Sequence, residues 1–521
     1  MAHRSRGCLR CRQRRVKCDG GRPSCQRCLT RNELCVGYRD EADLIFQHET
    51  DKVALKSQAE SVSSSSSTRT RRTRSRSLER PSPSQPLDAA TLRLPSALPW
   101  LKVPPSEKEP PVVEDHAVAI FMDKYVIYPC HESSSPGFLE HLPVLFQEVN
   151  VDGRHALRWA VQAAAIADLS REHDPKFLAP RALECYGQAL GALGRSLAEK
   201  GKIPDDYDLM AVVILDMFET FFMPGVSSVE SHTQGMAHIL RLRGHEQFHD
   251  PRGWSLFRLA HHRLQKQQLA KQIAPLPESK FWLDTLNEEM LTVRLEKDAL
   301  EISTICQKAN EILRALSADT LDLQQFLDLF PQMTRLDQKA VLQRYTPEWD
   351  FKTLQRTEIL GDQEVIRRFP EKIQLHRDVW MAYEWNYHRT ARIILHQKLL
   401  ACLDKARSIP TSQQHSFGSE DMIRDGEEAS LFHIKTLADE ILATVPQSFG
   451  EIDHLGRCLP DLSKPPRCQA IGAYLLLWPI KIIKDPKGMT TPSQKAAAQR
   501  VFERIRDCTG MKSNLGALSV I

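Results

Sequence analysis

Six cysteines near the amino terminus constrain this chain more than any other feature. They form two copies of the spacing Cys-x2-Cys-x6-Cys, at Cys8, Cys11, Cys18, Cys25, Cys28 and Cys35. The first residues contain no apolar segment of the kind that a secretory signal requires, which predicts a reducing compartment where disulfides do not persist. Clustered thiols in such a compartment are typical of metal binding. The repeat therefore predicts a small amino-terminal unit built around metal ions.

The number of cysteines predicts two zinc ions that share ligands. The two thiols of a Cys-x2-Cys turn can bind one ion, with each sulfur at about 2.3 Å from zinc. Two separate tetrahedral sites need more sulfur atoms than six cysteines provide, unless two of the sulfurs bridge the ions. The symmetry of the repeat assigns the bridging positions to the leading cysteine of each half, Cys8 and Cys25.

Positive charge is concentrated around these cysteines. Residues 1–39 contain 11 Lys or Arg and 2 acidic residues, whereas the net charge of all 521 residues is only +4. A cationic end on an otherwise acidic chain indicates a polyanionic partner, and nucleic acid is favoured over membrane. The first half of the repeat contains RQRRVK, but the matching LTRNEL has one cation, which Glu33 cancels. We therefore assign nucleic-acid contact to a helix over roughly residues 11–17.

The segment resembles the fungal six-cysteine binuclear zinc cluster, the DNA-binding domain of a large transcription-factor family. The likeness rests on all six ligand positions, on the basic run RCRQRRVKCD, and on Pro23, two residues before the fourth cysteine. It implies that the partner is double-stranded DNA with CGG-type, G-rich triplets. It also implies that Arg14 and Arg15 contact bases, because guanine O6 and N7 accept hydrogen bonds from arginine. The other cations are assigned to phosphate contacts that fix register: Arg12, Lys17, Arg10 and Arg22.

The next segments are expected to connect this cluster domain, residues 1–39, to the rest of the chain. Residues 40–60 are expected to form a linker helix without a convincing heptad pattern, so the sequence does not decide between a monomer and a homodimer. Residues 61–114 are rich in Ser, Arg and Pro, which predicts a disordered basic linker. Five arginines there form a nuclear import signal, a phosphate-binding arm or a soluble spacer: Arg69, Arg71, Arg72, Arg74 and Arg76.

Residues 115–521 are expected to form a large all-α domain, of one or two lobes. Leu183, Tyr186, Leu190, Leu193 and Leu197 recur at helical spacing on one face. Similar patterns predict helices at 156–169, 209–222, 254–270, 283–316, 373–405, 427–444, 467–483 and 494–508, with a polar loop near 406–425. Alternating strands joined by hairpin turns are not evident. No apolar run approaches the roughly 18 residues of a membrane helix, so no membrane contact is expected.

This large segment resembles, less specifically, the fungal-specific transcription-factor regulatory domain. The likeness rests on HTQGMAHILRLRG (232–244), VWMAYEWNYHRTARIILH (379–396) and LLLWPIKII (475–483). Its aromatic residues are expected in the core or between helices, with the lining of an effector pocket as the alternative: Trp380, Trp385, Tyr387 and Trp478. The seven cysteines beyond the cluster are expected to be buried structural thiols. His261 and His262 are expected to lie on a helix face rather than to bind metal.

These features predict a nuclear, sequence-specific transcription regulator that controls a biosynthetic gene cluster or a metabolic pathway. A small-molecule effector or a coregulator is the expected partner of the helical domain. The common phosphate-binding, dinucleotide-binding, hydrolase and zinc-protease motifs are absent, so an enzyme is not expected. Two alternatives stay open. One is an effector-sensing or protein-interaction protein whose cluster is only a structural module, and the other is an enzyme with a DNA-binding appendage.

Overall fold

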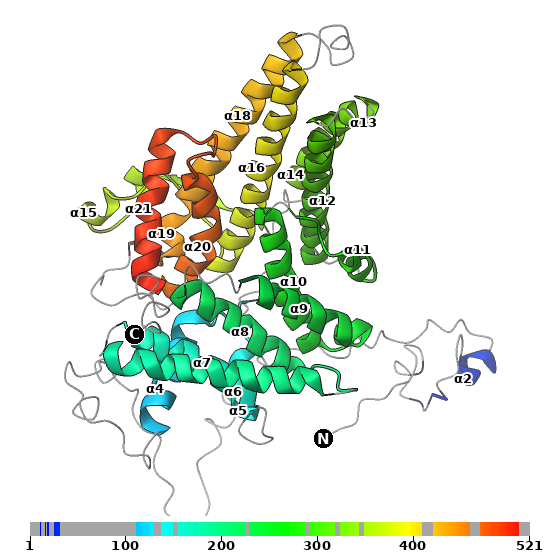
Figure 1. Ribbon diagram of the computed structural model, residues 1–521, viewed down its shortest axis with the longest axis vertical. Helices are drawn as coiled ribbons and strands as arrows, with labels where there is room; N and C mark the ends of the chain where they lie inside the picture. Colours follow the sequence, from blue (N-terminus) through cyan, green and yellow to red (C-terminus); the bar gives the residue numbers. More distant parts are fainter. Residues whose placement is uncertain are drawn as a thin grey trace, which may run out of the picture. The chain divides into compact units, whose positions relative to one another are not determined.

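A computed structural model describes the chain in two compact units, Met1–Leu94 and Pro95–Ile521. The described residues are 11, 16, 18–19, 25–31, 111–128, 137–149, 155–171, 173, 175–199, 201–223, 229–271, 273–286, 291–317, 323–342, 349–408, 420–458 and 469–509. The described part of the first unit contains the short helix α2 (Gln26–Leu29). All other named helices and strands belong to the second unit (Figure 1).

The second unit is mainly helical, as the sequence predicts. Its first half contains α4 (Pro111–Tyr125), α5 (Leu142–Glu148), α6 (His155–Leu169), α7 (Pro175–Ala198), α8 (Asp206–Phe222), α9 (Val229–Arg243) and the 3-10 turn η4 (Gly244–Phe248). Then follow α10 (Pro251–Lys271), α11 (Pro277–Asp284), α12 (Leu291–Ser317), α13 (Leu323–Leu327), α14 (Leu329–Leu342), α15 (Gln363–Ile366), α16 (Val379–Arg407), α18 (Glu420–Ala443), α19 (Val445–Ser448), α20 (Gln469–Lys484) and α21 (Pro492–Thr509). In the described ranges, none of these helices combines the length and the apolar character needed to cross a membrane.

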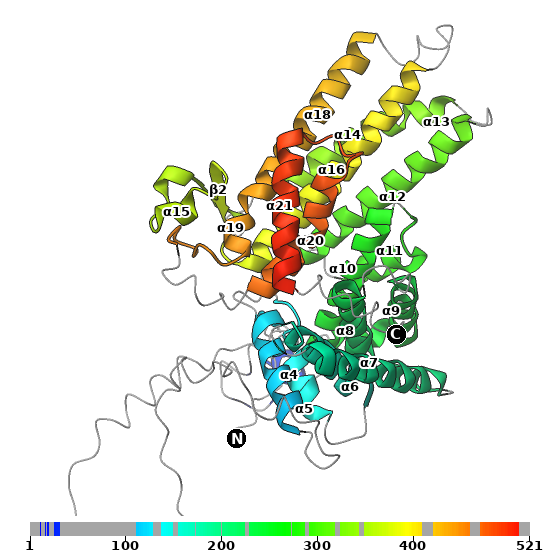
Figure 2. The same ribbon diagram turned by 60° about the vertical axis from the view of Figure 1, so that its left-hand side comes forward.

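Helix α6 is the centre of the first half. It packs against α4, α7 and α8, which surround it in Figure 2. Twelve of its 15 residues are buried, including the polar residues Gln162 and Asp168. Helix α8 is equally enclosed and begins at a capping box, in which the Asp205 carboxylate accepts hydrogen bonds from the amides of Tyr207 and Asp208.

Helix α16 organises the second half. It spans 29 residues and begins at Asp378, whose carboxylate accepts a hydrogen bond from the Met381 amide at 2.7 Å. It packs against α12, α14, α18 and α20, and α20 packs in turn against α21. Helix α10 joins the two halves, because it contacts α8 and α9 on one side and α12 on the other. Figure 1 shows α12, α14, α16 and α18 running alongside one another.

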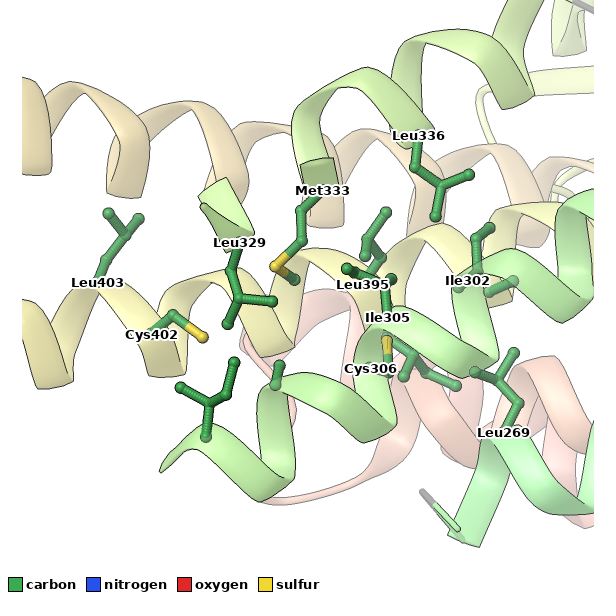
Figure 3. Packing of buried hydrophobic residues seen from close by; sticks show 14 of the residues in the cluster. Leu269, Ile302, Ile305, Cys306, Leu329, Met333, Leu336, Leu395, Cys402 and Leu403 are labelled. Atoms are coloured by element: carbon green, nitrogen blue, oxygen red, sulfur yellow. The ribbon is translucent and has the colours of Figure 1, made fainter. Parts of the chain in front are cut away.

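An apolar core fills the space between these helices. Figure 3 shows Leu269 of α10, residues of α12 and α14, and Leu395, Cys402 and Leu403 of α16 pointing toward one another. The two thiols in this core, Cys306 and Cys402, are buried, and burial raises the pKa of Cys306 to about 12. Thiols in such surroundings stay protonated and unreactive. The prediction that all seven cysteines beyond the cluster are buried holds in part. Cys185, Cys306 and Cys402 are buried, Cys458 and Cys508 are only half-buried, and Cys130 and Cys468 lie outside the described residues.

A two-stranded antiparallel pair interrupts the helical pattern. Strand β1 (Lys352–Gln355) pairs with β2 (Lys372–Leu375), in a register that joins Lys352 to Leu375 and Gln355 to Lys372. The sequence analysis missed this pair and placed residues 373–378 at the start of a helix. The error arises because the four residues KIQL are too few to distinguish the apolar spacing of a strand from that of a helix. Asp378, the N-cap, marks the true start of the helix.

Most of the predicted helices are present, with different ends. The range 283–316 contains the end of α11 and all of α12 except its last residue, so one predicted helix is two. The predicted loop near 406–425 is shorter than expected, because α16 extends to Arg407 and α18 begins at Glu420. The aromatic residues lie where the sequence places them. Trp380, Tyr387 and Trp478 are buried, and half-buried Trp385 donates a hydrogen bond from Nε1 to the Trp349 carbonyl at 3.0 Å.

Candidate metal centre

The structure describes four of the six predicted zinc ligands: Cys11, Cys18, Cys25 and Cys28. Cys8 and Cys35 lie outside the described residues. The predicted DNA-contacting side chains also lie outside them: Arg10, Arg12, Arg14, Arg15, Lys17 and Arg22. So do the five arginines of 69–76 and the predicted linkers up to residue 110. The geometry of the four cysteines is therefore the structural basis for a metal centre.

The sulfur atoms of Cys11, Cys25 and Cys28 converge on one point. All three lie within 4.8 Å of one another, and the Sγ atoms of Cys11 and Cys25 are 3.8 Å apart. Two thiolates that bind one tetrahedral zinc ion at about 2.3 Å lie about 3.8 Å apart, whereas a disulfide brings the sulfurs to about 2.05 Å. The spacing of these sulfurs therefore fits shared coordination of zinc and not a disulfide.

Cys25 occupies a central place among the described ligands. It belongs to the group with Cys11 and Cys28 and also to a second group with Cys18 and Asp19, whose ligand atoms lie within 4.8 Å of one another. Cys11, Cys25 and Cys28 are buried, with exposed fractions of 3%, 0% and 2%. Thiolates are the soft ligands that zinc prefers in structural sites. The donor set and its burial thus fit a structural zinc centre.

Local hydrogen bonds place the cysteines. The Val16 amide donates to the Cys11 carbonyl at 3.0 Å, a six-to-one bond of the type that closes helix C-termini. In the second half, Cys25 is the extended N-cap of α2, and the Cys28 amide donates to the Cys25 carbonyl at 3.1 Å. The Cys-x2-Cys turn therefore places the Cys25 and Cys28 thiols on one side of the start of α2.

Asp19 links the two halves and was not singled out by the sequence analysis. Its Oδ2 atom accepts a hydrogen bond from the amide of Gln26, the first residue of α2, at 3.0 Å. The N-cap Cys25 makes no side-chain cap bond, so the carboxylate of Asp19 satisfies a helix amide that Cys25 leaves open. An acidic residue directly after the third cysteine of the repeat is the only sequence signal for this contact.

The paired histidines of α10 are structural. His262 lies between two partners, with Nδ1 2.6 Å from Glu296 and Nε2 2.8 Å from the Tyr383 hydroxyl. His261 Nε2 lies 2.9 Å from the Ser279 hydroxyl. Burial alone would raise the pKa of Glu296, but the two histidines outweigh it and lower the pKa to about 2. Both histidines thus lie on the buried face of α10, where they contact polar side chains of neighbouring helices.

The second unit contains a groove large enough for a small organic molecule. It has a volume of about 890 Å³ and lies between α11, α12 and α14. Its apolar surface comes from Pro275, Leu276, Pro277, Leu283, Leu300, Ile305 and Leu336. Five cationic side chains and two carboxylates line the rest: Lys280, Lys297, Lys308, Arg335, Lys339, Asp284 and Glu301. None of the aromatic residues singled out in the sequence lines this groove.

Comparisons with known proteins agree with the cysteine geometry. Residues 6–44 match the family model of the fungal Zn(2)-Cys(6) binuclear cluster domain. The chain is 23% identical over 399 residues to the transcription factor dbaG of Emericella nidulans, which covers 73% of this chain and 85% of that protein. It is 47% identical over 38 residues to white-opaque regulator 2 of Candida albicans, which covers 7% of this chain and 8% of that protein. No solved structure matches the chain.

The spacing, the sulfur geometry and these matches lead to one conclusion. They point to a regulator rather than to an enzyme. Residues 6–44 form a fungal Zn(2)-Cys(6) binuclear cluster domain that binds two zinc ions, in a DNA-binding transcription regulator homologous to fungal transcription factors.

Proposed function

We propose that this protein is a nuclear, sequence-specific regulator of transcription that recognises CGG-type triplets through the first half of its cysteine repeat. The observation that carries the proposal is the convergence of the Cys11, Cys25 and Cys28 sulfurs within a segment that matches the zinc cluster domain. We divide the chain into a cluster domain (1–39), a linker helix (40–60), a basic linker (61–114) and a regulatory domain (115–521).

In this proposal Cys8 and Cys25 bridge the two ions, and Cys11, Cys18, Cys28 and Cys35 complete their coordination. The position of Cys25 in both groups of converging ligands supports its assignment as a bridge. Zinc supplies fixed tetrahedral geometry, which a segment of about 40 residues cannot obtain from an apolar core. The protein side chains then perform the recognition.

Arg14 and Arg15 contact guanine, while Arg12, Lys17, Arg10 and Arg22 contact phosphate. The charge of the segment supports this assignment, because residues 1–39 keep a large cationic excess even after the two acidic residues are counted. Base contacts discriminate between sequences and phosphate contacts do not. The two kinds of residue should therefore respond differently to a change of DNA sequence.

The helical unit is proposed to be the regulatory domain, and its groove between α11, α12 and α14 is the proposed effector site. The support is the combination of an apolar surface with an excess of cationic side chains, which suits an amphipathic organic anion. Arg69, Arg71, Arg72, Arg74 and Arg76 are proposed to direct nuclear import. The regulated genes belong, in this proposal, to a biosynthetic gene cluster or a metabolic pathway.

Fluorescence anisotropy with two duplexes tests the proposal. One duplex contains a CGG triplet and the other has that triplet scrambled. Arg15→Ala should weaken binding to the CGG duplex by about 1–3 kcal/mol and should change binding to the scrambled duplex little. Lys17→Ala is the matched control, since it should weaken both equally and lower the salt slope by about 1. Equal losses for Arg15→Ala on both duplexes would contradict its assignment as a base contact.

A further inference from the structure

A second cluster of metal-binding side chains lies in the helical unit. Asp337 of α14, His396 of α16 and His433 of α18 bring one carboxylate and two imidazoles together, and their ligand atoms lie within 4.8 Å of one another. The three residues are far apart in the sequence and come from three different helices. Their approach is therefore a product of the tertiary structure.

His396 is the most buried residue of this cluster. It is only 6% exposed, and its Nδ1 atom has no hydrogen-bond partner among the described residues. Its Nε2 atom lies 3.3 Å from Asp337 Oδ1. Its ring stacks on that of His433, with centroids 4.8 Å apart and planes at 15°. A buried ring nitrogen without a hydrogen-bond partner is costly, and a metal ion bound to the ring would offset that cost.

Arg392 holds the carboxylate of this cluster. Its Nε atom donates to Asp337 Oδ1 at 2.6 Å and its Nη2 atom to Oδ2 at 2.9 Å. A carboxylate offers about four lone-pair positions, so this two-point contact leaves Asp337 able to bind an ion. Hydrogen-bonded partners of this kind commonly orient metal-binding carboxylates. Because the guanidinium offsets the charge of Asp337, the imidazoles must supply much of the affinity, which should be lower than that of the cysteine cluster.

Solvent reaches the cluster through a groove. The three residues line a groove of about 830 Å³ between α14, α16 and α18, where His433 is half-buried. An ion can therefore enter, and a water molecule can occupy a further coordination position. Two imidazoles and a carboxylate with an open position are a common donor set for zinc.

We propose that Asp337, His396 and His433 bind one zinc ion in addition to the two of the cysteine cluster. This ion ties α14, α16 and α18 together at the rim of the groove. It makes the stability of the helical unit depend on zinc, and it does not require that the protein bind DNA.

Native mass spectrometry of the full chain in zinc-buffered solution tests the proposal. The wild-type chain should carry three zinc ions, and His433→Gln and Asp337→Asn should each carry two. His454→Gln changes an exposed histidine elsewhere and should keep three. In parallel, zinc added to the two-zinc form should raise the melting temperature of the helical unit in the wild type but not in His433→Gln.

Two results would overturn the proposal. One is a wild-type chain that holds only two ions when zinc is saturating. The other is a third ion that both His433→Gln and Asp337→Asn retain, since it would then lie elsewhere. Circular dichroism that matches the wild type shows that a variant is folded, and the half-buried position of His433 favours that result.

Discussion

The two units of this chain bury different chemistry. In the described part of the first unit, the buried side chains are three cysteines of the cluster, Cys11, Cys25 and Cys28. In the second unit, leucine, isoleucine, phenylalanine and alanine side chains from many helices form the core, as in Figure 3. A short segment cannot bury enough apolar surface to fold alone, whereas a chain of several hundred residues can. The comparison teaches that dependence on the two cluster ions should be confined to the first unit.

The largest expected effect is loss of the cluster on removal of zinc. Structural zinc contributes about 10–16 kcal/mol to the folding of small zinc domains. Chelation should therefore expose the cluster cysteines to an alkylating reagent. Cys306 and Cys402 should stay protected by the apolar core, even after the ion proposed at His433 is lost. Peptide mass spectrometry after labelling measures both groups in one sample. Equal labelling of Cys306 and of the cluster would show that the distinction is wrong.

A cavity in the apolar core should have the next largest effect. Phe326 is fully buried in the core of the second unit, with its ring centroid 5.3 Å from that of Phe330. Phe326→Ala should lower the free energy of unfolding of this unit by about 3–5 kcal/mol in a urea titration. Met422→Ala shortens a side chain that is 65% exposed and should change it by less than about 0.5 kcal/mol. Zinc binding by the cysteine cluster should be unchanged in both variants. Loss of that zinc would show that the first unit depends on the apolar core of the second.

The second unit should also respond to acid through His376, a smaller effect. Burial and the nearby charge of Arg389 hold the pKa of His376 well below its usual 6.5. Below that pH the unfolded chain binds a proton that the folded chain excludes, so stability falls as the pH falls, by about 1.4 kcal/mol per pH unit.

His376→Phe should remove this contribution. The difference between wild type and variant, from urea titrations at several pH values, isolates it from the other titrating groups. A difference that does not vary below pH 6.5 would mean that His376 is protonated in the folded protein.

Asp19 should give the smallest effect. Its bond to the Gln26 amide caps α2, and removal of such a cap costs about 0.5–2 kcal/mol. Asp19→Ala should therefore make the cluster lose zinc at a lower chelator concentration, whereas Asp19→Asn, which keeps an acceptor, should resemble the wild type. Competition with a colorimetric chelator measures this. Identical curves for Asp19→Ala and wild type would show that this hydrogen bond does not stabilise the zinc-bound cluster.

The sequence predicts some parts of this molecule far better than others. The cysteine cluster can be predicted from the sequence because its ligands are close together and few kinds of metal site have their spacing. The long helices can be predicted where apolar residues recur at helical spacing, as in α6 and α7. Strands β1 and β2 could not be predicted, because each is four residues long and their pairing depends on tertiary contact. The sequence also could not predict the cluster of Asp337, His396 and His433, because only the packing of α14, α16 and α18 brings these residues together.

The central claim is that zinc held by the cysteine repeat enables this chain to bind specific DNA. The most direct test is the affinity of the full chain for a CGG duplex before chelation, after exhaustive chelation, and after zinc is returned. We expect specific binding to disappear with the metal and to return with it. Tight, sequence-specific binding by a chain that elemental analysis shows to be free of zinc would contradict the account.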